Sequence, residues 1–179
     1  MLGILLIGID ITLIRIDIGV GSGCIILSIL NEKPGFYGKG IDICSKSIRL
    51  SELNAMKLSA ENRVKFIKTN VDNFCHRKYD LIISNPPYIK SNKIKYLEKD
   101  VCNFEPRLAL DGGLDGLSGI KKVVRKSSEL IKNHGKLILE IAHDQKEEVI
   151  RILRGNNFYV NKIMKDFANK DRCIISTKI

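Results

Sequence analysis

A short apolar run that ends at two consecutive prolines restricts the fold of this chain more than any other stretch. The run extends from Tyr79 to Ser84, and it predicts a buried strand because it is too short for a helix. Pro86 and Pro87 have no backbone N–H and cannot continue the pairing of a central strand. The strand therefore ends at Asn85, at the carboxyl edge where open α/β sheets bind their ligands.

The tetrapeptide Asn85-Pro86-Pro87-Tyr88 after this strand has the groups needed to hold a planar amino or amide nitrogen. The side-chain oxygen of Asn85 and the backbone carbonyl of Pro86 can accept the two N–H bonds of an NH2 group, and Tyr88 can stack on the flat group. We therefore predict that Asn85, Pro86 and Tyr88 are catalytic and that all four residues bind substrate. The alternative is a turn that ends the strand and carries no chemistry.

A glycine-rich loop lies between the first predicted strand, Leu13 to Ile18, and the first predicted helix, which begins at Cys24. Glycines allow a positive φ and a close approach of a ligand to the backbone, and the start of the helix adds free N–H donors. The spacing Gly19-x-Gly21-x-Gly23 differs from the dinucleotide fingerprint, whose third glycine would fall at Cys24. The pattern therefore favours a ligand other than NAD.

The second predicted strand, Phe36 to Ile41, is followed directly by Asp42. An acidic residue at this point, about 20 residues after a glycine loop, is placed to hydrogen-bond two ribose hydroxyls. The alternative is an ordinary aspartate before a helix. That helix is expected to be capped by Ser45, and the residues expected on its buried face are Leu50, Leu53, Met56 and Ala60.

A third predicted strand, Val64 to Ile67, leads to the loop segment Asp72-Asn73-Phe74 at the same edge of the sheet. An aspartate there can accept a hydrogen bond from an adenine amino group, with Phe74 as an apolar wall. A turn formed by Asp72 and Asn73 explains the same residues without a ligand.

The rest of the chain continues the alternation of helix and strand after a segment of little periodicity, 89–117, and long loops of this kind are usually functional. The first predicted element is a helix that is capped by Ser118 and ends at Gly135, and its shared face consists of Ile120, Val123, Val124, Ser127, Leu130 and Ile131. A strand from Lys136 to Ile141 follows, and then a helix from Asp144 to Arg154 with Asp144 and Glu147 as a capping box. The last two predicted strands, Phe158 to Met164 and Arg172 to Thr177, form an antiparallel pair.

This alternation predicts one α/β domain over 1–179, with a mainly parallel, doubly wound sheet and helices on both faces. Right-handed crossovers place the loops after the first four strands at one edge of the sheet. Gly19–Gly23, Asp42, Asp72 and Asn85 are therefore expected to meet in one crevice.

Composition and charge restrict the class of protein. Five cysteines without a Cys-x-x-Cys pair argue against a disulfide framework and favour a cytoplasmic location. The three histidines lack ligand spacing, so we predict no metal. The apolar start, 1–14, has no basic segment or cleavage pattern and is too short to cross a bilayer, so no membrane association is expected. The net charge of +10 fits either nucleic-acid or ribosome proximity or a lysine-rich genome bias.

Taken together, these residues resemble the class I S-adenosylmethionine-dependent methyltransferases, and more narrowly the protein-(glutamine-N5) methyltransferases that modify peptide chain release factors. The resemblance extends from about Ile16 to the C-terminus. Its Asn-Pro-Pro-Tyr element is shared with adenine-N6 methyltransferases, and the segments after it narrow the choice. The matching segments are Asp17-x-Gly19-x-Gly21-Ser22-Gly23, Asp42, Asp72-x-Phe74, Asn85-Pro86-Pro87-Tyr88, Phe104-Glu105-Pro106 with Ala109-Leu110, Gly113-x-Asp115-Gly116, Leu139-Glu140-Ile141 and Asp171-Arg172.

The resemblance implies a Rossmann-like, seven-stranded sheet of order 3-2-1-4-5-7-6 with strand seven antiparallel. It also implies S-adenosyl-L-methionine as cofactor and a peptide chain release factor as protein substrate. The target glutamine amide would be held by Asn85 to Tyr88, with Glu105 as a further substrate-binding residue. The implied cofactor-binding residues are Asp17, Gly19, Val20, Gly21, Ser22, Gly23, Asp42, Asp72, Asn73 and Asn85.

The sequence departs from the family pattern at two places. Asn73 stands where the family usually carries an aromatic residue, and the family's N-terminal helical substrate-binding domain and its Pro-Arg-x-Asp-Thr-Glu-like segment have no counterpart here. Two other functions stay open at this point. The positive charge and the possible stacking of an adenine on Tyr88 fit an adenine-N6 nucleic-acid methyltransferase, and the unusual N-terminus fits a truncated, inactive cofactor-binding remnant.

Overall fold

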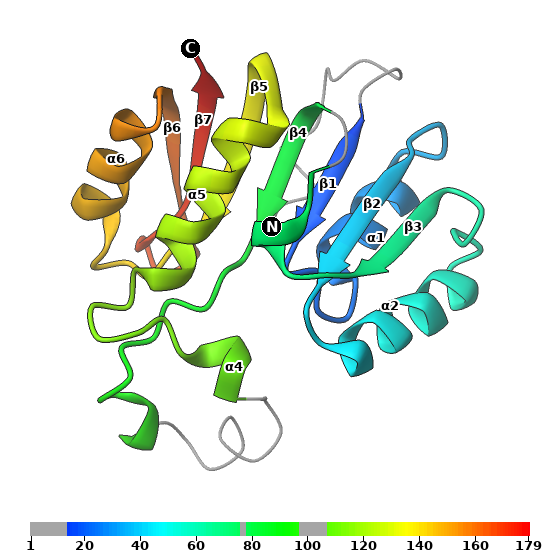
Figure 1. Cartoon of the computed structure of the whole chain (residues 1–179), viewed down its shortest axis with the longest axis horizontal. Coiled ribbons are helices and arrows are strands. Elements are labelled where there is room, and N and C mark those ends of the chain that lie inside the picture. The colour runs from blue at the N-terminus through cyan, green and yellow to red at the C-terminus, as the bar shows by residue number, and fades with distance from the viewer. Residues whose placement is uncertain (1–13, 76–77, 97–106) are drawn as a thin grey trace.

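The computed structural model describes residues 14–75, 78–96 and 107–179, which form one seven-stranded sheet with helices on both faces (Figure 1). The strands are β1 (Arg15–Ile18), β2 (Gly38–Asp42), β3 (Val64–Lys68), β4 (Tyr79–Ser84), β5 (Ile131–Glu140), β6 (Phe158–Lys165) and β7 (Asp171–Lys178). The helices are α1 (Cys24–Glu32), α2 (Ser45–Lys57), α4 (Arg107–Leu110), α5 (Ser118–Leu130) and α6 (Lys146–Gly155), with 3-10 turns η2 (Val71–Asn73) and η3 (Ile94–Tyr96). The predicted substrate-binding residue Glu105, and Phe104 and Pro106 of the same matching segment, lie outside the described residues.

The strand order is β3-β2-β1-β4-β5-β7-β6, which confirms the predicted topology. The five strands from β3 to β5 pair in parallel, and β7 pairs antiparallel with both β5 and β6. Strand β4 covers Tyr79–Ser84, as predicted. The order places the carboxyl ends of β1, β2 and β4 next to one another at a single edge of the sheet.

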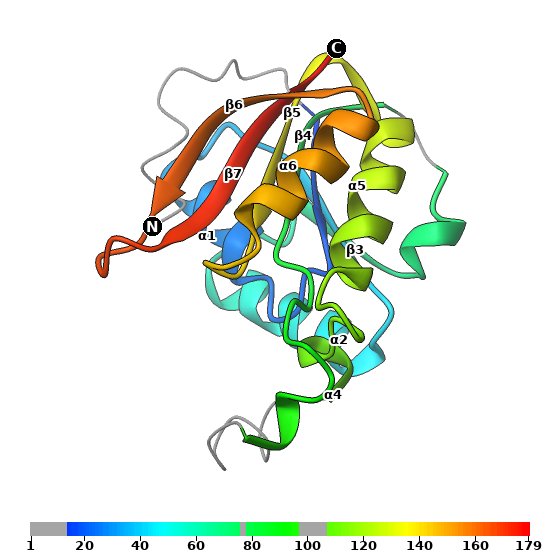
Figure 2. The same ribbon diagram turned by 90° about the vertical axis from the view of Figure 1, so that its left-hand side faces the viewer.

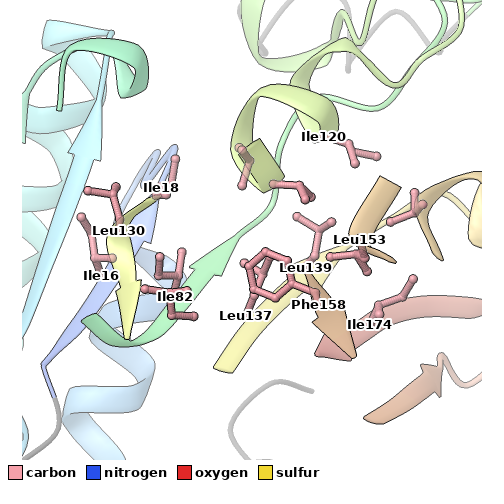
Figure 3. Packing of buried hydrophobic residues seen from close by; sticks show 14 of the residues in the cluster. Ile16, Ile18, Ile82, Ile120, Leu130, Leu137, Leu139, Leu153, Phe158 and Ile174 are labelled. Carbon is pink, nitrogen blue, oxygen red and sulfur yellow. The ribbon is translucent and has the colours of Figure 1, made fainter. Parts of the chain in front are cut away.

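Alternating side chains of β4 enter two separate hydrophobic clusters, because successive residues of a strand point to opposite faces. Ile82 packs in the cluster that includes α5 and α6, whereas Leu81 and Ile83 pack in the cluster that includes α1 and α2. Figure 2 shows α5 and α6 together on one side of the sheet and α1 on the other. Figure 3 shows the first cluster, with Ile16, Ile18, Ile82, Leu137 and Leu139 of the sheet and Ile120 and Leu130 of α5. Both faces are thus filled, and the strand ends are left for binding.

The predicted apolar face of α2 is wrong. Leu50, Leu53 and Met56 are 47%, 48% and 61% exposed, and the residues that α2 buries are Ile48, Ser51 and Ala55. Ser51 and Ala55 are small, and a Cβ added at Gly23 would lie only 3.1 Å from Ser51 Cβ. The helix therefore turns the small side chain of Ser51 toward the glycine loop. Ala60, just beyond the helix, is buried as predicted.

Three predicted helix caps are wrong as well, namely Ser45, Ser118 and Asp144. The N-cap residues are Cys44, Leu117 and Gln145, and their side chains make no capping hydrogen bond. In the first two helices an upstream aspartate accepts the backbone N–H of the N-cap residue instead: Asp42 Oδ1 from Cys44 at 2.8 Å, and Asp115 Oδ1 from Leu117 at 2.9 Å.

The end of the helix that begins at Ser118 was also misplaced at Gly135. Helix α5 ends at Leu130, and β5 begins at Ile131, five residues before the predicted strand. The predicted buried face of α5 is nevertheless confirmed, because Ile120, Val123, Val124, Ser127 and Leu130 are all buried. Among the described residues, no helix is long and apolar enough to span a bilayer.

Candidate functional site

The ends of three neighbouring strands lie at the same level and bring the predicted site residues together. Ile18 at the end of β1 pairs with Ile41 of β2 and with Ser84 of β4. Ser84 Oγ donates to the backbone carbonyl of Ile18 at 2.7 Å, which ties β4 to β1 at this level. The next residue along each strand is Gly19, Asp42 or Asn85. The glycine loop, the acidic residue and the amide turn therefore converge at one edge, as expected from the sequence.

The glycine loop turns sharply because Gly19, Gly21 and Gly23 have φ values of 74°, 55° and 82°. The backbone N–H groups of Gly19 and Val20 donate to Ile41 O at 2.9 and 3.0 Å, which fixes the loop against β2. A methyl group added at Gly19 or Gly21 would meet no described atom within 4 Å. The loop thus has open space on the side where a ligand can approach its backbone.

The two other loop residues predicted to bind a cofactor, Val20 and Ser22, make contacts that hold the loop. Val20 is 5% exposed and its side chain packs in the hydrophobic cluster below the loop. The carbonyl of Ser22 accepts a hydrogen bond from Asn54 Nδ2 of α2 at 2.9 Å. Both contacts hold the loop in place.

Asp42 links the glycine loop to the start of α2. Its Oδ2 accepts the backbone N–H of Gly21 at 3.0 Å, and its Oδ1 accepts the backbone N–H of Cys44 at 2.8 Å. Each carboxylate oxygen has two lone-pair sites, so the half-buried group retains acceptor capacity for two hydroxyl groups of a ligand. The predicted ribose-binding role fits this geometry.

Asp17, at the base of the loop, is a buried acid without a well-formed hydrogen bond. Its side chain is 1% exposed, and neither carboxylate oxygen has a hydrogen-bond partner of good geometry among the described residues. Burial raises the pKa of Asp17 to about 8, Asp42 adds to the rise, and the Ile26 backbone N–H only partly offsets it. The neutral form of the Asp17 carboxyl group is therefore favoured well above the pH at which an exposed aspartate ionises.

Replacing Asp17 with asparagine should remove a loss of stability between pH 4 and pH 8. The pKa is raised in the folded state, so the unfolded chain ionises first, and the free energy of unfolding falls as pH rises from the unfolded pKa through the folded one, by up to about 1.4 kcal/mol per unit. Urea unfolding of both proteins at a series of pH values measures this. A wild-type profile parallel to that of Asp17→Asn would contradict the assignment.

The four residues of the amide turn differ in their exposure to solvent. Asn85 is exposed, Pro86 is buried, and Pro87 and Tyr88 are half-buried. The Tyr88 hydroxyl and the Glu140 carboxylate at the end of β5 influence each other's pKa. Burial is the main cause that raises the pKa of Tyr88 and of Glu140, and the nearby Arg172 opposes both rises. The Tyr88 side chain is thus half-buried in an electrostatic environment that includes Glu140 and Arg172, while Asn85 is exposed to solvent.

The third loop lies beside this site, but its side chains have partners elsewhere. Thr69 N donates to Asp42 O at 2.8 Å, which places the start of the loop next to β2. The Asp72 carboxylate binds Lys122 at 3.1 Å and Arg125 at 2.6 Å on α5, and the hydrogen bond from Lys122 is the first cause that lowers the pKa of Asp72. Asn73 follows in the same 3-10 turn. An adenine amino group would therefore share Asp72 with two cations.

Phe74 does not form the expected apolar wall. Its side chain is 2% exposed and packs in the core, with its ring centroid 6.3 Å from that of Tyr79. The sequence placed Phe74 in the loop correctly, but a large aromatic residue at the entry to a buried strand gains more by filling the core.

Sequence reasoning missed Gln145 as part of this edge. Gln145 Nε2 donates to Tyr88 O at 3.1 Å and to Gly116 O at 3.0 Å. No pattern within the helix region indicates such a role, because the contact joins three segments that are distant in sequence. The Leu139-Glu140-Ile141 match was the nearest signal.

Other features of the surface lie away from this edge or carry no ligand chemistry. A hollow of about 290 Å³, lined by Cys75, Lys78, Lys126, Glu129 and Leu130, lies near the amino end of β4, at the opposite edge of the sheet. Within the described ranges, no group of three or more potential metal ligands is found.

Comparison with known proteins identifies similar chains of greater length. The sequence is 40% identical over 165 residues to a release factor glutamine methyltransferase from Fusobacterium nucleatum subsp. nucleatum, covering 91% of this chain and 46% of the relative. It is 36% identical over 163 residues to a release factor glutamine methyltransferase from Rhodospirillum rubrum, covering 91% and 50%. The chain therefore spans about half the length of these curated relatives.

Solved structures share the fold at low sequence identity. A ribosomal protein L11 methylase from Lactobacillus delbrueckii subsp. bulgaricus superposes with a TM-score of 0.71 at 18% identity, covering 99% of this chain and 76% of that one. A magnesium protoporphyrin IX methyltransferase from Synechocystis, solved with bound SAM, superposes with a TM-score of 0.64 at 19% identity, covering 93% and 70%.

A family model described as the methyltransferase small domain matches residues 11–114, which is more than half of the chain and includes the glycine loop, Asp42 and the amide turn. The chain belongs to the methyltransferase small domain family.

Proposed function

We propose that this protein methylates the side-chain amide nitrogen of a glutamine in a peptide chain release factor, with S-adenosyl-L-methionine as the methyl donor. The observation that carries the proposal is the placement of Asn85 directly beside the glycine loop, fixed by the pairing of Ile18 with Ser84. Family membership supports methyl transfer, and the names of the relatives support the substrate.

The residues around the glycine loop fit the proposed cofactor. Gly19 and Gly21 leave open space in front of the backbone, and Asp42 retains acceptor capacity for a diol. The buried oxygens of Asp17 lack well-formed hydrogen bonds, and a cationic ligand nearby would stabilise their charged form. When bound, S-adenosyl-L-methionine supplies an electrophilic methyl group on a sulfonium.

The main contribution of the protein to the proposed methyl transfer would be to orient the target amide relative to the methyl donor. An amide nitrogen is a poor nucleophile because its lone pair is delocalised into the carbonyl group. Asn85 Oδ1 and the Pro86 carbonyl would accept the two N–H bonds of the target NH2 group and fix its plane, and Tyr88 would lie against it. Correct orientation of two reactants can recover about 7–11 kcal/mol of the barrier. The proton would leave late, to solvent.

The proposed partner and location follow from the same substrate. Release factors act in the cytoplasm, and Cys24, Cys44, Cys75 and Cys173 are all free thiols in the described part of the chain, as expected in a reducing compartment. Transient proximity to the ribosome would also give the net charge of +10 a role.

One incubation with a methyl-labelled donor tests the proposal, with a release factor, ribosomal RNA and DNA offered side by side. We expect label in the release factor, on a glutamine, with a rate that changes little between low and high salt. Label in nucleic acid, with a rate that falls steeply with salt as phosphate contacts require, would overturn the substrate in favour of an adenine-N6 methyltransferase. Label in none of the three would favour a cofactor-binding remnant.

A further inference from the structure

A single amide side chain joins three segments behind the amide turn. Gln145, at the N-cap of α6, is 5% exposed. Its Nε2 donates to Tyr88 O at 3.1 Å and to Gly116 O at 3.0 Å, and its Oε1 accepts the backbone N–H of Ala142 at 3.1 Å. Both side-chain N–H bonds are therefore used on carbonyls of the turn and of the loop before α5. Without Gln145, the carbonyls of Tyr88 and Gly116 would lose the hydrogen bonds from its side-chain amide.

The backbone of the loop approaches the turn so closely that glycine is required. A Cβ added at Gly116, where φ is 76°, would lie 2.7 Å from Tyr88 O and 2.8 Å from Gln145 Nε2. At Gly112 it would lie 2.9 Å from Tyr88 C, and at Gly119 it would lie 2.9 Å from Pro87 O. Three glycines thus let residues 112–119 lie directly against the backbone of Pro87 and Tyr88.

Further hydrogen bonds join the segment after the amide turn to the loop before α5. Ile89 N donates to Leu110 O at 3.1 Å, and Gly112 N donates back to Ile89 O at 2.8 Å. Asp111 Oδ1 accepts Ser91 Oγ at 2.6 Å and Gly113 N at 2.9 Å. The chain after the amide turn is therefore clamped to residues 110–116, with Gln145 behind the joint.

The side chain of Tyr88 interacts with charged groups from the same region of the chain. Glu140, five residues before Gln145, and Arg172 both interact electrostatically with Tyr88, and Arg172 Nε donates to Asp166 Oδ2 at 2.9 Å. The direct hydrogen bond from this region to Tyr88 is the one that Gln145 donates to its carbonyl.

We propose that Gln145 is a positioning residue for the methyl transfer, acting through the backbone of Tyr88 to fix the adjoining turn and so the Pro86 carbonyl and the Asn85 side chain that orient the target amide. This inference rests on the proposed function. Gln145 bonds to the turn through the carbonyl of Tyr88 and to the loop before α5 through the carbonyl of Gly116. Its loss should reduce turnover and leave cofactor affinity intact, because the glycine loop and Asp42 are held by other contacts.

The variant Gln145→Glu tests this most sharply, since it keeps the size of the side chain and an acceptor for Ala142 N but replaces the donor with a second acceptor. We expect turnover on the release factor to fall roughly 10- to 100-fold, as small misplacements of reacting groups do, with the dissociation constant for the demethylated cofactor within threefold of wild type. Hydrogen exchange at Ile89 and Gly112 should become about tenfold faster, because the hydrogen bonds Ile89 N to Leu110 O and Gly112 N to Ile89 O close the joint. Gln145→Met, which lacks both donor and acceptor, should act in the same direction.

Asn156→Ala is the matched control, because Asn156 Nδ2 also donates to a backbone carbonyl, Ile152 O at 2.8 Å, but at the other end of α6. It should leave turnover and exchange at Gly112 unchanged. Gln145 variants with wild-type turnover and exchange would overturn the proposal, as would a loss of cofactor affinity equal to the loss of turnover. If the Gln145 variants show faster hydrogen exchange but the wild-type protein methylates no release factor, the structural role of Gln145 at the joint is supported and the proposed substrate is overturned.

Discussion

Replacing Asn85 with alanine should reduce turnover by at least about 100-fold while cofactor affinity changes less than threefold. Asn85 is the exposed residue of the turn, and its oxygen is the side-chain acceptor proposed to orient the target NH2 group. Loss of one preorganised hydrogen-bonding group at a reacting centre typically costs a factor of 10² to 10³. Initial rates with a labelled methyl donor and calorimetry with the demethylated cofactor measure the two effects separately.

Two further variants show whether the effect is specific to the side-chain oxygen of Asn85. Asn85→Asp keeps an acceptor oxygen and should retain more turnover than Asn85→Ala. Asn92→Ala removes an exposed asparagine from the same connecting segment and should behave as wild type. Near-normal turnover in Asn85→Ala would remove Asn85 from the mechanism.

Replacing Asp42 with alanine should weaken cofactor binding roughly 100-fold, which corresponds to about 2.7 kcal/mol. The carboxylate accepts the backbone N–H groups of Gly21 and Cys44, and hydrogen bonds to charged groups contribute about 1.5–3 kcal/mol each. Loss of Asp42 therefore loosens the glycine loop and removes the acceptors proposed for the ribose. Calorimetric titration with the demethylated cofactor measures the change.

The effect of Asp42 should show mainly in binding. At saturating cofactor, turnover should recover to within about tenfold of wild type, because the amide turn is held by separate contacts. Asp42→Asn keeps one acceptor oxygen and should fall between alanine and wild type. Asp144→Ala, an exposed aspartate that makes no cap, should bind the cofactor as wild type does; unchanged affinity in Asp42→Ala would instead exclude Asp42 from the binding site.

The family resemblance implies the strand order, whereas strong local signals in the sequence predict the convergence of the site. Prolines end β4 at Ser84, and the acidic residue and glycines follow their strands directly, so parallel pairing alone brings Gly19, Asp42 and Asn85 to one level. Strand boundaries in a parallel sheet therefore fix the position of loop residues to within a residue or two.

The errors arose where tertiary contacts decide between similar local patterns. Leu50 and Leu53 have the spacing of a buried face, yet α2 turns Ser51 and Ala55 inward instead. The small side chain of Ser51 allows the helix to lie close to Gly23 of the glycine loop. The ion pairs of Asp72 with Lys122 and Arg125 were not predicted, because these cations come from a distant segment; the contact of Asp72 with adenine stays a prediction. Gln145 has no local signal at all, since both of its carbonyl partners lie far away in the sequence.

The claim that the glycine loop and the amide turn face one cleft is tested most directly by amide chemical shifts during titration with the demethylated cofactor. We predict saturable shifts at Gly19, Gly21 and Gly23 together with the backbone and side-chain amides of Asn85. Shifts in the glycine loop that leave Asn85 unchanged at saturation would contradict a shared cleft, and with it the proposed transfer of methyl to a bound amide.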